Sequence, residues 1–110
     1  MIKNEYGIEK ISIESTAKCF CPLGKDWYTN QFTITMYPYS YLPDYCDLDA
    51  FIKENINGKH LIIEAAVAML YEHIAQTYTP SYLEVLSYVD DAAHSAVTVT
   101  RTSENKMVLL

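Results

Sequence analysis

The amino-acid sequence predicts an α+β domain in which two helices cover one face of a four-stranded antiparallel sheet. Two segments with apolar residues at every second position come first, two segments with helical spacing follow, and two further alternating segments end the pattern. This strand-strand-helix-helix-strand-strand order favours antiparallel neighbours with both helices in one insertion. At 110 residues, of which 50% are hydrophobic, the chain has the size of one domain. We expect a single domain over residues 1–110, with loose ends near residues 1–8 and 103–110.

The first two strands are expected over residues 9–18 and 31–37. In both segments apolar side chains alternate with polar ones, as in a strand with one buried face. Pro22 and Gly24 interrupt the pattern within residues 21–26, which indicates a turn. These two strands should therefore pair as an antiparallel hairpin.

The two helices are expected in the middle of the chain. Two prolines within residues 38–44 make that stretch a connection. Asp47 can act as the N-cap of a short helix that ends at Asn57-Gly58. A longer helix is predicted over residues 61–77, and Pro80 stops it.

The last two strands are expected over residues 82–89 and 96–101, where alternation and a density of Val and Thr favour extended structure. The predicted helices cover one face of the sheet, so its other face and its edges lack cover. We expect neighbouring subunits to close the sheet into a barrel. The protein should then be a homo-oligomer with sites between subunits.

Charge and cysteine content favour a small-molecule substrate and a reducing compartment. The net charge of −6 gives no basic footprint for tight nucleic-acid binding, although an oligomer can gather basic groups in one groove, so RNA or DNA stays open. Three cysteines do not form a disulfide framework. The first residues lack a signal-peptide core and no stretch is long enough to span a membrane, so we expect a soluble, cytoplasmic protein.

Glu64 is the only charged residue in the apolar run from Leu61 to Leu70. A carboxylate in the first turn of a helix complements the helix dipole and can simply face solvent. An ionised carboxylate can also accept two parallel N–H bonds, which suits the edge of a guanine-like ring. Glu64 is therefore a candidate for binding a purine-like or pterin-like heterocycle.

Cys21 and Asp26 flank the predicted turn, where a thiol can meet a ligand and a nearby carboxyl can move a proton. The structural alternatives are a packed cysteine and a turn-capping aspartate. The pair Cys19 and Cys21 lacks a second pair of ligands at metal spacing, so we expect no metal. No Gly-rich nucleotide loop and no Gly-x-Ser-x-Gly elbow occurs, so the sequence gives no support for a phosphate-binding loop or for serine hydrolysis.

The order of these motifs resembles the 7-cyano-7-deazaguanine reductase family of queuosine biosynthesis and its short amidine-forming relatives. The similarity runs from residues 19 to 89 and rests on Cys21-Pro22, Gly24, Asp26-Trp27 with Thr29, Glu64, and Pro80-x-Tyr82-Leu83-Glu84-Val85. It implies the tunnelling fold. It also implies that Cys21 adds to the substrate nitrile to give a thioimide, that Asp26 donates a proton, and that Glu64 binds the base.

Three departures from this pattern bear on the chemistry. The spacing from Cys21 to Asp26 is about two residues shorter than in the family, so Cys19 stays an alternative nucleophile. Ile63 occupies the place of a family histidine. The Glu-Ser-Leu-Lys stretch that serves NADPH in the reductases is absent, and the region with Asp44, Asp47 and Asp49 would repel its phosphates. Resolution of the thioimide by NADPH or by ammonia is therefore open.

A second, weaker similarity is to dihydroneopterin aldolase, another tunnelling-fold enzyme. It rests on Asp44-Tyr45 and on Leu61-Ile62-Ile63-Glu64, and it implies that Tyr45 and Glu64 contact a pterin. The catalytic lysine is absent, since the matching stretch reads Ser87-Tyr88-Val89-Asp90-Asp91. The leading hypothesis is a thioimide-forming enzyme of deazapurine metabolism. A pterin enzyme or a non-catalytic purine- or pterin-binding module is the alternative.

Overall fold

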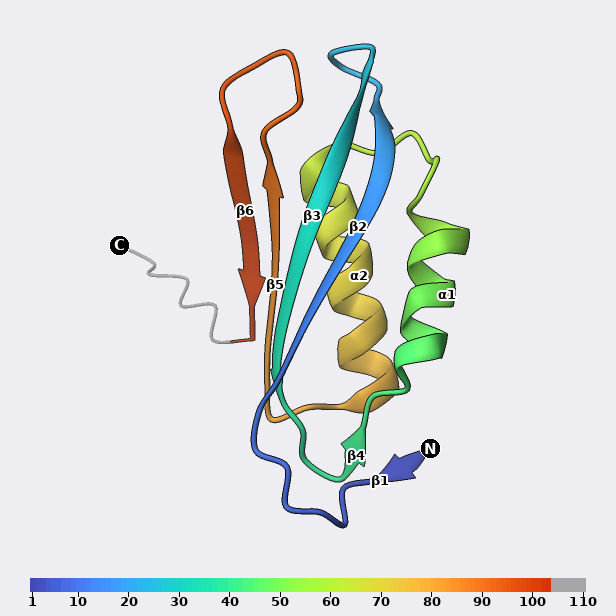
Figure 1. The fold of residues 1–110 in the computed structure, drawn as a ribbon, viewed down its shortest axis with the longest axis vertical. Helices are drawn as coiled ribbons and strands as arrows, with labels where there is room; N and C mark the ends of the chain where they lie inside the picture. The colour runs from blue at the N-terminus through green and yellow to red at the C-terminus, as the bar shows by residue number, and fades with distance from the viewer. Residues whose placement is uncertain (104–110) are drawn as a thin grey trace, which may run out of the picture.

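The computed structural model describes residues 1–103 as an antiparallel sheet with two helices (Figure 1). In chain order the elements are β1 (Ile2–Lys3), β2 (Ile11–Cys21), β3 (Asp26–Tyr37), β4 (Tyr41–Leu42), α1 (Tyr45–Asn55), α2 (Ile63–Tyr78), β5 (Tyr82–Val89) and β6 (Val97–Thr102). The main sheet has the order β2-β3-β5-β6, and every neighbouring pair is antiparallel. The predicted α+β architecture is confirmed.

Alternation along the strands separates a helix-covered face from an open face. Along β3 and β5 every second side chain is buried, and these side chains pack with those of the helices into one core. In Figure 1, α2 passes behind β2 and β3 with α1 beside it, so both helices lie on the same side of the sheet. On α2 the core side chains recur at helical spacing: Ile63, Ala66, Val67, Leu70, Ile74 and Tyr78.

The β2–β3 hairpin is longer than the sequence predicts. β3 begins at Asp26 instead of residue 31, because Trp27 and Thr29 pair with Phe20 and Lys18 of β2. On the open face the rings of Phe20 and Trp27 meet edge to face, with centroids 5.5 Å apart. The expected turn is confirmed but tight, and Lys25 takes a left-handed backbone angle, φ 54°, to close it.

The prediction that Asp47 caps the first helix is wrong. The N-cap is Asp44, whose carboxylate accepts hydrogen bonds from the backbone N–H groups of Cys46 at 3.0 Å and Asp47 at 3.2 Å. Asp47 instead lies in the first turn, where its charge complements the helix dipole. The end of the helix before Asn57 agrees with the sequence pattern.

Outside the main sheet, β1 and β4 form a short antiparallel pair, with Ile2 opposite Leu42. The sequence predicts a loose end for residues 1–8 and a connection for residues 38–44, and neither pattern indicates this pairing. Of the expected loose segment near residues 103–110, residues 104–110 lie outside the described part. No helix in residues 1–103 is long and apolar enough to cross a bilayer.

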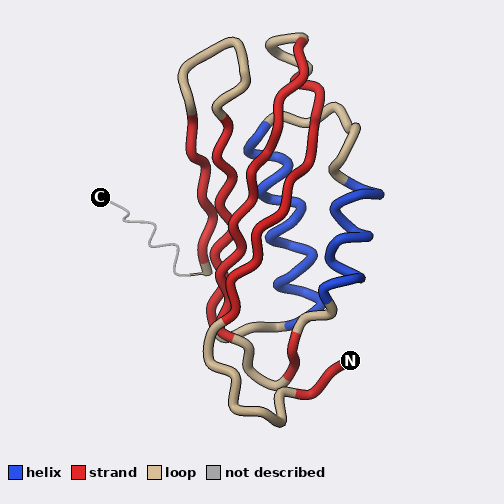
Figure 2. The backbone as a smooth tube through the Cα atoms, in the orientation of Figure 1, coloured by secondary structure: helices blue, strands red, loops and turns tan. Residues whose placement is uncertain are grey.

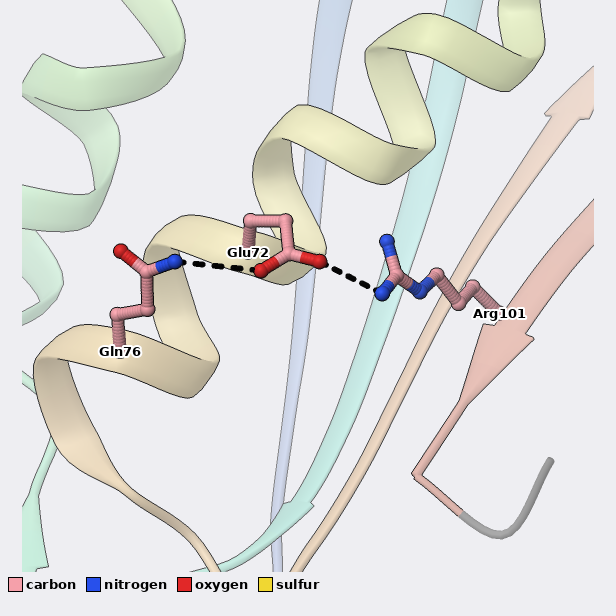
Figure 3. A network of polar contacts seen from close by, with 3 residues as sticks. All are labelled: Glu72, Gln76 and Arg101. Atoms are coloured by element: carbon pink, nitrogen blue, oxygen red, sulfur yellow. Dashed lines mark hydrogen bonds and ion pairs between the residues drawn. The ribbon is translucent and has the colours of Figure 1, made fainter.

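Figure 2 shows that β2 and β3 run most of the length of the molecule and that α2 lies alongside them. A polar network fastens β6 to α2 (Figure 3). The guanidinium of Arg101 donates to Glu72 at 2.6 Å and lies 4.2 Å from the ring of Tyr71, while Gln76 donates to the other Glu72 oxygen at 3.3 Å. Because these groups are solvent-exposed, the ion pair stabilises the fold by less than about 1 kcal/mol.

Candidate functional site

A cavity of about 340 Å³ lies at the end of the molecule where the β2–β3 turn, the β5–β6 loop and the start of α2 meet (Figure 1). Cys21, Asp26 and Glu64 all line it. Its lining is mainly apolar and includes Leu23 and Trp27. The structure thus brings together three of the four site residues that the sequence analysis singled out.

Cys21 and Asp26 face each other across the hairpin. They are the last residue of β2 and the first of β3, and they form a direct cross-strand pair. Side chains at such positions lie on the same face of the sheet. The Cys21 sulfur accepts a hydrogen bond from the backbone N–H of Gly24 at 3.4 Å, and an Asp26 oxygen accepts one from the N–H of Trp27 at 2.8 Å. The short spacing that departs from the family pattern therefore still places thiol and carboxyl next to each other.

Cys19 has a different environment although it lies on the same face of the same strand. It is fully buried, its thiol donates to the Ile56 carbonyl at 3.2 Å, and its sulfur accepts from the Asn30 amide at 3.4 Å. Burial raises the pKa of the Cys19 thiol. Cys19 is not among the residues that line the cavity. A ligand in the cavity therefore meets Cys21.

Glu64 lies in the first turn of α2, at an exposed position on the cavity wall. The N-cap residue, Ile62, provides no side-chain hydrogen bond to the helix N-terminus. The Glu64 carboxylate is therefore next to backbone N–H groups that a side chain does not cap, a favourable position for a negative charge. The dipole explanation and the binding explanation for this residue are compatible, because the helix N-terminus itself faces the cavity.

Tyr45, the fourth of these site residues, lies at the end of the molecule opposite the cavity. It is the first residue of α1 and is 55% exposed. The Tyr78 hydroxyl at the end of α2 donates to the Asp44 carbonyl at 3.4 Å, so the start of α1 adjoins the end of α2. Since Glu64 is at the other end of this helix, Tyr45 and Glu64 are separated by roughly 20 Å. One chain therefore does not bring Tyr45 to the cavity.

Tyr28 and His94 also line the cavity, and the sequence analysis did not select either as a site residue. Tyr28 is buried, and its hydroxyl donates to the Leu61 carbonyl at 2.5 Å, which fixes the segment leading into α2. Burial raises the pKa of the Tyr28 phenol. His94 belongs to the β5–β6 loop, and its Nδ1 lies 2.7 Å from the Ser95 carbonyl oxygen. Both residues reach the site through contacts between distant parts of the chain, which no local pattern reveals.

Two aspartates at the end of β5 hold the β5–β6 loop against β3. Asp91 accepts a hydrogen bond from the backbone N–H of Thr29 at 2.9 Å, and Asp90 accepts one from the Gln31 side chain at 3.1 Å. The hydrogen bonds from Thr29 lower the pKa of the Asp91 carboxyl. These bonds position the loop that forms one wall of the cavity.

Comparison with known proteins gives a structural match without a sequence match. No protein-family model and no curated protein matches the chain. A solved structure described as the archaeosine synthase QueF-Like in the apo form superposes with a TM-score of 0.77 at 14% sequence identity. The alignment covers 89% of this chain and 96% of that chain. Together with the two helices on a four-stranded antiparallel sheet, this likeness shows that the chain has the tunnelling fold.

Proposed function

We propose that the protein is an enzyme of deazapurine metabolism in which Cys21 adds to the nitrile of a 7-cyano-7-deazaguanine-like base. The observation that carries the proposal is the meeting of Cys21, Asp26 and Glu64, from three different elements, in one cavity. The cavity volume of about 340 Å³ is in the range of small-molecule sites. The solved structure with the same fold is named as an archaeosine synthase, which supports the substrate class.

Glu64 would orient the ring. Its two carboxylate oxygens can accept the ring N–H and the exocyclic amine of a guanine-like edge, and the apolar walls would cover the faces of the ring. The side of the ring that carries the nitrile would then face the β2–β3 turn. This arrangement would bring the electrophilic carbon near Cys21, the only thiol among the described residues that line the cavity.

The covalent step needs no oxidant or reductant. The Cys21 sulfur forms a bond to the nitrile carbon as one π bond of the nitrile breaks, and the nitrile nitrogen gains the proton that the thiol loses. Asp26, directly across the hairpin from Cys21, is the group placed to deliver that proton. The product is a thioimide bonded to the enzyme.

The described residues that line the cavity offer no group to hold the phosphates of NADPH as the second reactant. The described cavity lining contains no lysine or arginine that could pair with the cofactor phosphates. Asp44 and Asp47, in the region that carries the cofactor motif in the reductases, lie at the start of α1, at the other end of the fold. We therefore favour ammonia, which adds to the thioimide carbon and expels Cys21 as a thiol to leave an amidine.

Intact mass spectrometry tests the covalent step. Incubation with 7-cyano-7-deazaguanine should add the mass of one substrate molecule to the protein. The adduct should be lost in Cys21→Ala and kept in Cys19→Ala and Cys46→Ser, which are the matched controls. An adduct that survives Cys21→Ala, or no adduct on the unmodified protein, would contradict the mechanism. Binding without an adduct would instead favour a non-catalytic module.

A second measurement separates the two ways of resolving the thioimide. Added ammonium should release the adduct as a product with the mass of an amidine. Added NADPH should leave the adduct in place, with no change in NADPH absorbance. Consumption of NADPH in the presence of the substrate would show a reductase and refute the aminolytic step.

A further inference from the structure

His94 is a titratable side chain of the cavity to which the proposed reaction gives no role. It comes from the β5–β6 loop and lines the same cavity as Cys21 of β2, Asp26 of β3 and Glu64 of α2. A thiol becomes a strong nucleophile only as the thiolate, and an adjacent imidazole is the usual side chain that accepts its proton.

The hydrogen bond of His94 fixes which ring nitrogen can act as a base. Its Nδ1 lies 2.7 Å from the Ser95 carbonyl oxygen. A carbonyl oxygen only accepts hydrogen bonds, so Nδ1 must carry the hydrogen. In the neutral ring the lone pair is therefore on Nε2, which is free of this backbone contact.

The loop that carries His94 is anchored to β3 by hydrogen bonds and to the hydrophobic core by packing. Asp91 accepts from the Thr29 backbone at 2.9 Å, and Asp90 accepts from Gln31 at 3.1 Å. Ala92 packs against the hydrophobic core. Asp90, Asp91 and Ala92 are thus anchored. Because the loop is already ordered, little conformational entropy is lost when the imidazole is held at the cavity wall.

Among the described residues that line the cavity, His94 is the one nitrogen base. Asp26 and Glu64 supply two carboxylates, and no lysine or arginine of the described residues lines the cavity. Tyr28 is engaged with the Leu61 carbonyl.

We propose that His94 Nε2 accepts the thiol proton of Cys21 and so generates the nucleophilic thiolate. The S–H bond breaks, its electron pair stays on sulfur, and the new N–H bond forms on the imidazole. In the proposed reaction the imidazolium then passes this proton to the Asp26 carboxylate, and Asp26 protonates the nitrile nitrogen. One thiol and one nitrile give one thioimide, with no further reactant. Only the steps that involve the nitrile rest on the proposed function; the proton transfer from Cys21 to His94 does not.

The test measures the reactivity of Cys21 without a nitrile. The rate of alkylation of Cys21 by iodoacetamide is followed by peptide mass spectrometry in a Cys46→Ser background, across a pH series. His94→Gln should lower this rate at pH 7 by roughly tenfold. The difference should disappear at high pH, where the thiol ionises without a base. The control is His60→Gln, since His60 contacts the Phe20 ring on the open face and does not line the cavity.

The outcomes separate the inference from the proposed function. Equal pH–rate profiles for the unmodified protein and His94→Gln would overturn the role of His94, even if the nitrile adduct forms. A profile that depends on His94, without a nitrile adduct, would support the base and reject the nitrile as the substrate. An alkylation rate that His94→Gln lowers by the same factor at every pH would indicate a lost structural contact and would also overturn the proposal.

Discussion

At the scale of single residues, Cys19 and Cys21 show how position determines the role of one side-chain type. They are two residues apart and lie on the same face of β2, but Cys19 is fully buried against Asn30 and Ile56, whereas Cys21 is at the end of the strand and partly exposed. The buried thiol uses its hydrogen in a structural bond. The thiol at the strand end has the Gly24 N–H as its only hydrogen-bond partner within residues 1–103, and it lines the cavity.

Glu64 gives a prediction on ligand binding. Glu64→Gln in a Cys21→Ala background should raise the dissociation constant for 7-cyano-7-deazaguanine by about tenfold or more, measured by calorimetry. Glutamine offers one acceptor and one N–H donor to a ring edge that only donates, so one bond is lost and one repulsive contact arises.

The matched control for Glu64 is Glu72→Gln on the same helix. Glu72 pairs with Arg101 on the helix surface and does not line the cavity, so its replacement should leave binding unchanged (Figure 3). Equal affinity for Glu64→Gln and the unmodified chain would remove Glu64 from the binding site and leave the helix-dipole explanation.

At the scale of elements, the β5–β6 loop gives a prediction that depends on pH. The Thr29 hydrogen bonds hold the Asp91 pKa below its ordinary value of 3.8. The stabilisation is therefore complete above pH 3.8 and is lost as the pH falls through the lower folded-state pKa. Hydrogen exchange of the Thr29 amide, whose N–H donates to Asp91, should increase only in this acidic range once it is corrected for the intrinsic rate.

The Asp91→Ala variant should show the same change at neutral pH. Since Asp91 is exposed, we expect a roughly two- to fivefold faster exchange of the Thr29 amide, with the rest of the sheet unaffected. The control is Asp49→Ala, an exposed aspartate on α1 far from the loop. Unchanged exchange in Asp91→Ala would mean that Ala92 packing alone holds the loop.

The elements that the sequence predicts best are those with a single local pattern. β5 has the predicted bounds, because its alternation from Tyr82 to Val89 is uninterrupted. The sequence pattern misses the start of β3, because the polar Asn30 occupies a buried position and breaks the alternation, and residues 26–30 extend through pairing with β2. The pattern also misplaces the cap of α1, because both Asp44 and Asp47 suit the role; it is Asp44 that has the extended backbone of an N-cap.

The same distinction applies to the candidate site. Glu64 and Cys21 are visible in the sequence because each interrupts or ends a local pattern, and the cavity contains both. His94 and Tyr28 have no such signal. Their place depends on the packing of the β5–β6 loop and of the α1–α2 connection against the hairpin, which the sequence specifies only through the complete fold.

At the scale of the whole molecule, one face of the sheet has no helix cover in the single chain. The outward side chains are largely polar and include Thr16, Thr33, Thr98 and Thr100, and β2 and β6 are the two edges of the sheet. Among the described residues, the segment 58–61 bonds to β2 only at Lys18 and Phe20, so the rest of this edge can pair with another chain.

We therefore predict that sedimentation velocity will detect a homo-oligomer of several chains. Dilution should release smaller species, and ligand binding should weaken in parallel if neighbouring subunits complete the site. A monomer at every concentration tested would contradict this prediction and would leave the cavity of the single chain as the complete site.

The two sides of the cavity differ in how easily evolution or design can change them. The Tyr28–Leu61 bond links one side to the buried core, so substitutions there disturb folding and ligand contacts together. The side formed by residues 92–95 depends mainly on surface hydrogen bonds of two aspartates. On the proposed function, substitution of Ala93, which is exposed on the cavity wall, should alter the choice of ligand at little cost in stability while His94 and Ala92 are kept, so this position suits a library that seeks new substrates.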